Sequence, residues 1–144
     1  MAVTTQTLRD SEHDAVIKIV CTGGGHSGTT IDVSTLTGAE DDDTDRVAIT
    51  KILLSNARLA DTADEPVLLE WDATAKVAIA EFGSGNIEWG MRLDNNAGTG
   101  TTGDIIVTSA STNTRFTMIL FLKKTAGFAG TALSYRQVMP PRRA

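Results

Sequence analysis

The sequence is short of the residues from which most metal sites and catalytic centres are built, with one cysteine and two histidines among 144 residues. A single cysteine, Cys21, excludes an internal disulfide framework. It falls in phase with Ile17 and Ile19, which predicts a buried thiol and favours folding in the cytosol. With His13 and His26 alone, the chain has no spaced set of His and Cys ligands and no nucleophile motif. We therefore expect no enzyme, no metal and no cofactor, while paired carboxylates for glycoside hydrolysis stay open as an alternative.

Long apolar stretches are also absent. No run approaches the roughly 20 apolar residues of a membrane-spanning helix, and the polar residues 2–7 do not have the pattern of a signal peptide. The chain is 41% hydrophobic, which is enough for one packed core at this length. We expect a single soluble domain over residues 1–144 that binds no membrane.

Charge is distributed unevenly along the chain, whose net charge is -5. Residues 1–72 hold 5 Lys or Arg against 14 Asp or Glu, giving -9, and residues 73–144 hold 8 against 4, giving +4. Such asymmetry can steer copies of one protein head to tail, because complementary potentials favour encounter. The absence of a basic stripe argues against nucleic acid as a partner.

Short segments with two-residue alternation make up most of the chain between residues 13 and 124. In residues 87–93, for example, Ile87, Trp89 and Leu93 fall on one face and Glu88 and Arg92 on the other, as in a half-buried strand. Residues 46–58 and 64–80 are the best helix candidates, but the spacing of Val, Ile and Thr there favours strands. Eight strands are predicted, at residues 14–22, 29–36, 46–55, 67–72, 76–82, 87–93, 104–109 and 115–124.

Eight strands without an obligatory helix predict an all-β fold, an antiparallel sandwich of about eight strands resembling a jelly roll. The apolar run 116–122 is expected to be a central strand covered on both faces. The predicted core consists of Ile17, Ile19, Val33, Val47, Ile49, Leu69, Trp71, Ile87, Trp89, Leu93, Val107, Met118 and Leu120.

Both ends of the chain are expected to lie outside the core at residues 13–125. Residues 1–12 form a Thr-rich arm and residues 126–144 a tail that ends in Pro-Pro-Arg-Arg-Ala. Ordering such ends costs about 1–2 kcal/mol of backbone entropy per residue and needs contacts in return. We expect these extended arms to lie on neighbouring subunits or on a partner shell.

Acidic residues are concentrated at positions 40–45. Three of them alternate as in a calcium loop, but Arg46 and Ile52 stand where an EF-hand needs glycine and glutamate. A solvated turn that docks a basic surface of another copy is favoured, although a calcium site of another type stays open. The predicted assembly contacts are Asp41, Asp42, Asp43, Asp45, Arg142 and Arg143.

Two other patterns suggest ligands but have simpler explanations. Glycines at 23, 25 and 28 and at 98, 100 and 103 have dinucleotide-motif spacing, yet strand sequence follows each, where the motif needs a helix N-terminus. Trp71 and Trp89 could form a sugar-stacking platform, as in a carbohydrate-binding module. Both fall in phase with aliphatic residues, which favours a place in the core.

Residues 83–107, GSGNIEWGMRLDNNAGTGTTGDIIV, are followed by the apolar strand 116–122, FTMILFL. Together they resemble the small β-sandwich virion proteins of tailed bacteriophages, especially cyanophages and other marine phages. The resemblance implies a head decoration (cement) protein, or alternatively a neck or tail component. It also implies a homo-oligomer, here expected as a trimer, that binds the major capsid protein or another virion protein. The protein would be made in the host cytoplasm and located in the virion, and no site residues are carried over.

Overall fold

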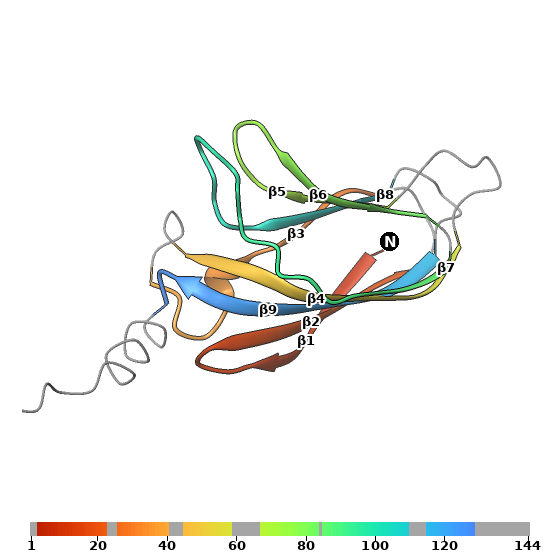
Figure 1. The fold of residues 1–144 in the computed structure, drawn as a ribbon, viewed down its shortest axis with the longest axis horizontal. Coiled ribbons are helices and arrows are strands. Elements are labelled where there is room, and N and C mark those ends of the chain that lie inside the picture. The colour runs from red at the N-terminus through yellow and green to blue at the C-terminus, as the bar shows by residue number, and fades with distance from the viewer. Residues whose placement is uncertain are drawn as a thin grey trace, which may run out of the picture.

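The computed structural model describes residues 3–22, 26–40, 45–58, 67–83, 85–109 and 115–128, which form nine β-strands and one short 3-10 helix. The strands build two antiparallel sheets that face each other across the core (Figure 1). Their bounds are β1 Val3–Asp10, β2 Asp14–Thr22, β3 His26–Ile31, β4 Arg46–Arg58, β5 Val67–Trp71, β6 Val77–Phe82, β7 Gly85–Trp89, β8 Ile105–Ser109 and β9 Arg115–Ala126, with the helix η1 at Val33–Thr35.

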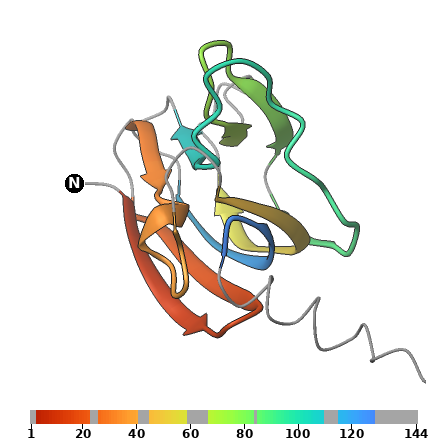
Figure 2. The same ribbon diagram turned by 90° about the vertical axis from the view of Figure 1, so that its left-hand side faces the viewer.

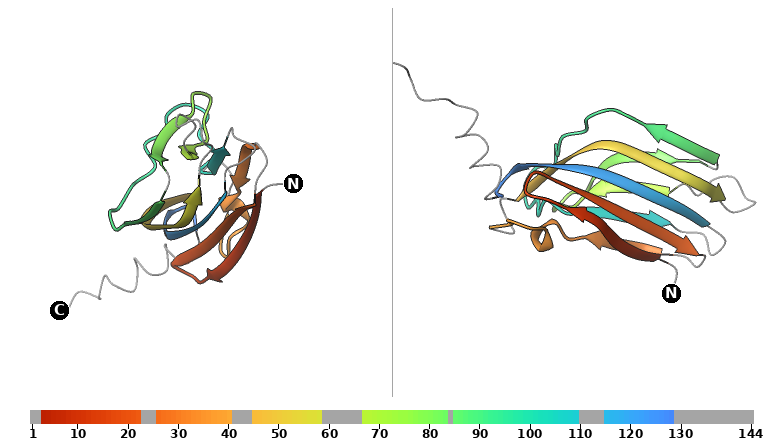
Figure 3. Two further views of the ribbon diagram at one scale, coloured as in Figure 1. Left: turned by 90° about the vertical axis from the view of Figure 1, so that its right-hand side faces the viewer. Right: turned by 90° about the horizontal axis from the view of Figure 1, so that it is seen from below.

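The strand order identifies the sandwich as a jelly roll with one added strand. The five-stranded sheet has the order β1-β2-β9-β4-β7 and the four-stranded sheet the order β3-β8-β5-β6. The pairs β2–β9, β3–β8, β4–β7 and β5–β6 are therefore nested, as when one long hairpin is rolled into two layers. The views in Figures 2 and 3 show the two layers from the ends and from below. The predicted all-β, jelly-roll-like sandwich is confirmed.

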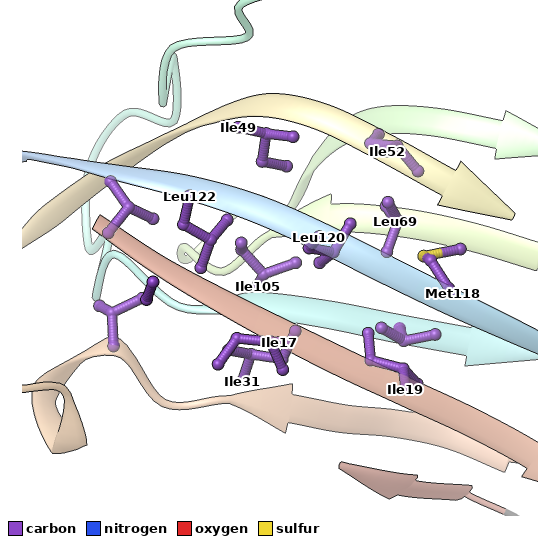
Figure 4. Packing of buried hydrophobic residues seen from close by; sticks show 14 of the residues in the cluster. Ile17, Ile19, Ile31, Ile49, Ile52, Leu69, Ile105, Met118, Leu120 and Leu122 are labelled. Atoms are coloured by element: carbon purple, nitrogen blue, oxygen red, sulfur yellow. The ribbon is translucent and has the colours of Figure 1, made fainter. Parts of the chain in front are cut away.

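The core lies between the inner faces of the two sheets (Figure 4). Alternate residues of β2 and β9 point inward, and Cys21 is buried among them as predicted. The predicted core residues are buried except Ile87, Trp89 and Leu93, which are half-buried. Ile87 and Trp89 belong to β7, an edge strand of the five-stranded sheet, and an edge position leaves part of each side chain open to solvent.

The predicted strand 29–36 is wrong beyond Ile31, where η1 follows. The carboxylate of Asp32 accepts hydrogen bonds from the backbone N–H of Ser34 at 2.9 Å and from its hydroxyl at 2.5 Å. The hydroxyl of Thr35 donates to the carbonyl oxygen of Asp32. Such local bonds from Asp, Ser and Thr offer the backbone an alternative to strand pairing, and the strand therefore ends early.

The predicted strand 87–93 is also too long, because β7 ends at Trp89. Met91 is exposed, whereas Leu93 returns to the sheet and exchanges two backbone hydrogen bonds with Ile49, at 2.9 and 2.7 Å. Residues 46–58, one of the two helix candidates, form strand β4. Across the described ranges, no helix has the length and apolar character needed to cross a membrane.

The prediction of an N-terminal arm is wrong for residues 3–10, because they form β1 at the edge of the five-stranded sheet. Val3 is buried, and the rest of β1 is mostly exposed threonine and other polar residues. An edge strand of this kind has no apolar alternation to identify it. The predicted tail also begins too early, since Phe128 is buried in the core. Residues 129–144 lie outside the described residues.

Candidate interaction surfaces

Lys124 is a buried cation that holds the β1–β2 hairpin against the rest of the sandwich. Its Nζ lies 2.7 Å from a carboxylate oxygen of Asp10, and it donates to the carbonyl oxygens of Ser11 at 2.5 Å and Thr37 at 2.7 Å. It also lies 5.3 Å from the centre of the Phe128 ring. These contacts satisfy the buried charge, so Lys124 acts as a structural anchor for the edge strand.

Asp45 does not present its side chain for assembly, because it is fully buried. One of its carboxylate oxygens accepts a hydrogen bond from the backbone N–H of Glu40 at 3.2 Å. The prediction that Asp45 belongs to an exposed docking turn is therefore wrong: the side chain folds back to hold the loop. The other predicted contacts, Asp41, Asp42, Asp43, Arg142 and Arg143, lie outside the described residues and stay predictions.

The described surface contains shallow hollows of about 220, 230 and 120 Å³. The largest is lined by Trp71, whose side chain is nevertheless buried, together with the ion-paired Arg92 and Asp94. Trp89 is half-buried and meets the ring of Phe82 edge to face at 6.3 Å. The buried Trp71 therefore offers no open ring face for sugar stacking, and the ring of Trp89 is only partly exposed. In the described ranges, no group of three or more His, Cys, Asp or Glu side chains is placed to hold a metal ion.

The outer face of the five-stranded sheet combines apolar and basic side chains; we call it the basic face. In its centre Ile119 and Phe121 of β9 point away from the core and are half-buried. Lys51 lies 5.7 Å from the centre of the Phe121 ring and 3.1 Å from a carboxylate oxygen of Glu88. The apolar members of this face are Val16, Val20, Leu53, Ile119 and Phe121, and its basic members are Arg9, Lys18, Lys51, Arg115 and Lys123.

The expectation that the β9 run is covered on both faces is wrong for the described residues. The four-stranded sheet covers the inner side of β9, and no described segment lies over its outer side, as the view from below shows (Figure 3). An antiparallel sheet that faces water usually has polar residues on that side. Ile119 and Phe121 depart from this rule at the centre of the face, so this surface is the strongest candidate for contact with a partner.

The outer face of the four-stranded sheet is acidic; we call it the acidic face. Asp32, Asp104 and Asp72 extend strands β3, β8 and β5 in register, because Ile31 and Trp71 both pair with Ile105. Further along the same face stand Glu70 and Glu81, beside the apolar side chains of Leu68 and Ile106.

Asp104 is the central carboxylate of this row. Burial, together with the negative charges of Asp32 and Asp72, raises the pKa of Asp104 to about 6, against the lowering effect of a hydrogen bond from the Val33 N–H at 3.0 Å. Burial is the main cause of the raised pKa, and the charges of Asp32 and Asp72 add to it because the three carboxylates lie in one row.

The acidic row and the Lys124 anchor were not found from the sequence. Asp32, Asp72 and Asp104 each lie next to a strand, but 72 positions separate the first from the last in the chain, and only the sheet order brings them together. The alternation of β9 could have identified Lys124, because it continues the inward series of Met118, Leu120 and Leu122.

No known protein family, curated protein or solved structure matches this chain. The resemblance to phage virion proteins therefore stays a prediction.

Proposed function

We propose that this protein is a non-enzymatic structural protein of a bacteriophage virion. In this proposal it is a capsid decoration (cement) protein that self-associates and binds the shell through its strand faces and chain ends. Jelly rolls occur repeatedly in viral capsid proteins and also in lectins. The fold alone does not select between such roles, so the proposal needs support from the surfaces.

The observation that carries the proposal is the apolar outer surface of β9. Ile119 and Phe121 lie at the centre of a sheet face, flanked by Val16 and Leu53 of the neighbouring strands. Apolar side chains gathered on one face, with charged residues around them, are typical of a protein–protein contact. A flat face of this kind suits binding to another protein surface better than binding a small substrate, which needs a concave pocket.

A neck or tail component would use the same surfaces, and it differs from a decoration protein in its place on the particle. A carbohydrate-binding module is supported less well, since Trp71 is buried and Trp89 packs against Phe82.

The proposal can be tested on virus particles purified by density centrifugation from a culture in which the chain is made. Quantitative mass spectrometry should find the chain in the particles, in fixed ratio to the major capsid protein across preparations. Washing with high salt controls for loose adsorption. If the chain stays in the soluble fraction while particles form without it, the proposal is wrong.

A further inference from the structure

The two outer faces of the sandwich carry opposite charge. Among the side chains that the structure describes, the basic face has five basic residues, and the two acidic side chains among them, Asp14 and Glu88, leave it at +3. The acidic face has five carboxylates, and Lys76, exposed just before β6, leaves it at -4 when all of them are ionised. Charges of opposite sign are therefore on opposite sides of one small domain.

Each face also has apolar side chains that are partly open to solvent. Ile119 and Phe121 lie at the centre of the basic face, and the half-buried Leu68 lies on the acidic face, one strand away from Ile106, which is itself buried. Two sheets that pack face to face lie about 10 Å apart. At that spacing, facing charges interact within about one Debye length in physiological salt.

We propose that copies of this chain stack head to tail, with the basic face of one copy on the acidic face of the next. The inference rests on the proposed function, because it names the surfaces by which copies of the structural protein associate. Stacking two basic faces or two acidic faces would place like charges together, which opposes binding. A head-to-tail contact is heterologous, so it closes into a ring when the rotation between copies permits and otherwise continues as a filament.

Charge reversal on each face tests the pairing. One variant carries Lys18→Glu and Lys123→Glu on the basic face, and the other carries Glu70→Lys and Glu81→Lys on the acidic face. The first variant then has a basic face of -1 opposite the acidic face of -4, and the second has an acidic face of 0 opposite the basic face of +3. Neither variant keeps the charge attraction between its two faces, so the self-association of each should weaken at least about tenfold. An equimolar mixture of the two should associate again, because the unchanged acidic face of the first variant meets the unchanged basic face of the second. Sedimentation velocity of the full chain measures both effects.

The matched control is a variant with Glu12→Lys and Asp94→Lys, which changes the net charge as much as the acidic-face variant but lies outside both faces. Its association should equal that of the wild type. If a reversal variant does not fold by circular dichroism, Lys→Gln and Glu→Gln at the same positions replace it. A smaller loss is expected, and mixing should again restore association through the two unchanged faces.

Three results would overturn the inference: a wild type that is monomeric up to millimolar concentration, a loss confined to one of the two reversal variants, or no recovery in the mixture of reversed variants. None of these results affects the particle test of the proposed function. If the chain is monomeric but present in virions, the proposed function is supported and the stacking is wrong. If the chain is oligomeric but absent from virions, the stacking is supported and the proposed function is wrong.

Discussion

The Nζ of Lys124, fully buried at the end of β9, lies 2.7 Å from the carboxylate of Asp10 at the end of β1. This contact ties the first strand of the chain to the last. Burial alone would raise the pKa of Asp10, but hydrogen bonds from Lys124 and from the backbone and hydroxyl of Thr37 outweigh it and hold the pKa below its ordinary value of 3.8. The edge strand β1 therefore depends on this buried ion pair as well as on its backbone pairing with β2.

Lys124→Met should destabilise the protein by about 3 kcal/mol or more, because breaking a buried ion pair leaves the partner and two carbonyl oxygens without their donor. Urea unfolding monitored by circular dichroism measures the change. The neighbouring Lys123 is exposed, so Lys123→Met is the control and should change stability by less than about 0.5 kcal/mol. Equal losses in the two variants would show that Lys124 is not an anchor.

The same substitution should release β1 before the rest of the fold. Hydrogen exchange of the β1 amides in the Lys124→Met variant should become faster, with the amides of β4 and β8 less affected, since local opening exposes the least anchored element first. Uniformly faster exchange throughout the sandwich would contradict a local role for this contact.

Asp10→Asn should reduce stability near neutral pH, and the difference from the wild type should shrink in acid. A carboxyl group with a lowered folded-state pKa contributes stability above its unfolded pKa, and this contribution is lost as pH falls through the folded value. Thermal unfolding of both proteins between pH 7 and strongly acidic pH checks the trend. A difference that does not change with pH would argue against an ion pair.

Asp104 should show the opposite dependence. Its pKa of about 6 lies above the ordinary 3.8, so its protonation stabilises the fold below pH 4 and this contribution is lost as pH rises through 6. In Asp104→Asn the amide oxygen can still accept from the Val33 N–H, and the repulsion from Asp32 and Asp72 is removed. The variant should gain stability relative to wild type as pH rises from 4 to 7.5. If the difference in stability between the variant and the wild type stays constant across this range, Asp104 is not destabilised by the charges of Asp32 and Asp72.

Gly103→Ala should cost more than about 1 kcal/mol, since this glycine has a φ of +85° and an added Cβ would overlap the carbonyl oxygen of Asp45. Gly98 on the same segment has no atom within 4 Å of an added Cβ, so Gly98→Ala is the control and should leave stability nearly unchanged. Chemical denaturation compares the two. If both variants unfold at the same urea concentration, the backbone of Gly103 is not packed closely against the carbonyl oxygen of Asp45.

The strongly alternating strands could be predicted from the sequence, and the polar edge could not. β2 was predicted with its observed bounds because Ala15, Ile17, Ile19 and Cys21 all face the core. Only Val3 of β1 is buried, so the Thr-rich sequence of this strand is equally typical of an unpaired arm. Backbone pairing with β2 and the Lys124 anchor order this strand, and neither leaves an apolar pattern in the sequence.

The surfaces were harder to predict than the core, because they depend on strand order. The charge asymmetry along the chain indicated contact between copies, but it was assigned to residues 40–45, where Asp45 is buried. The acidic face is instead assembled from Asp32, Asp72 and Asp104 at the ends of three strands. Similarly, the run 116–122 was correctly predicted as a central strand, while its outward residues Ile119 and Phe121 belong to an open face.

The proposed role of this jelly roll as a structural part of a virion can be examined by electron cryomicroscopy of native particles that contain the full chain. We expect density for the sandwich at symmetry-related positions on the particle, with the outer face of β9 covered by another protein surface. Particles that lack this density, or that bind the chain with Ile119 and Phe121 facing open solvent, would contradict the proposed role.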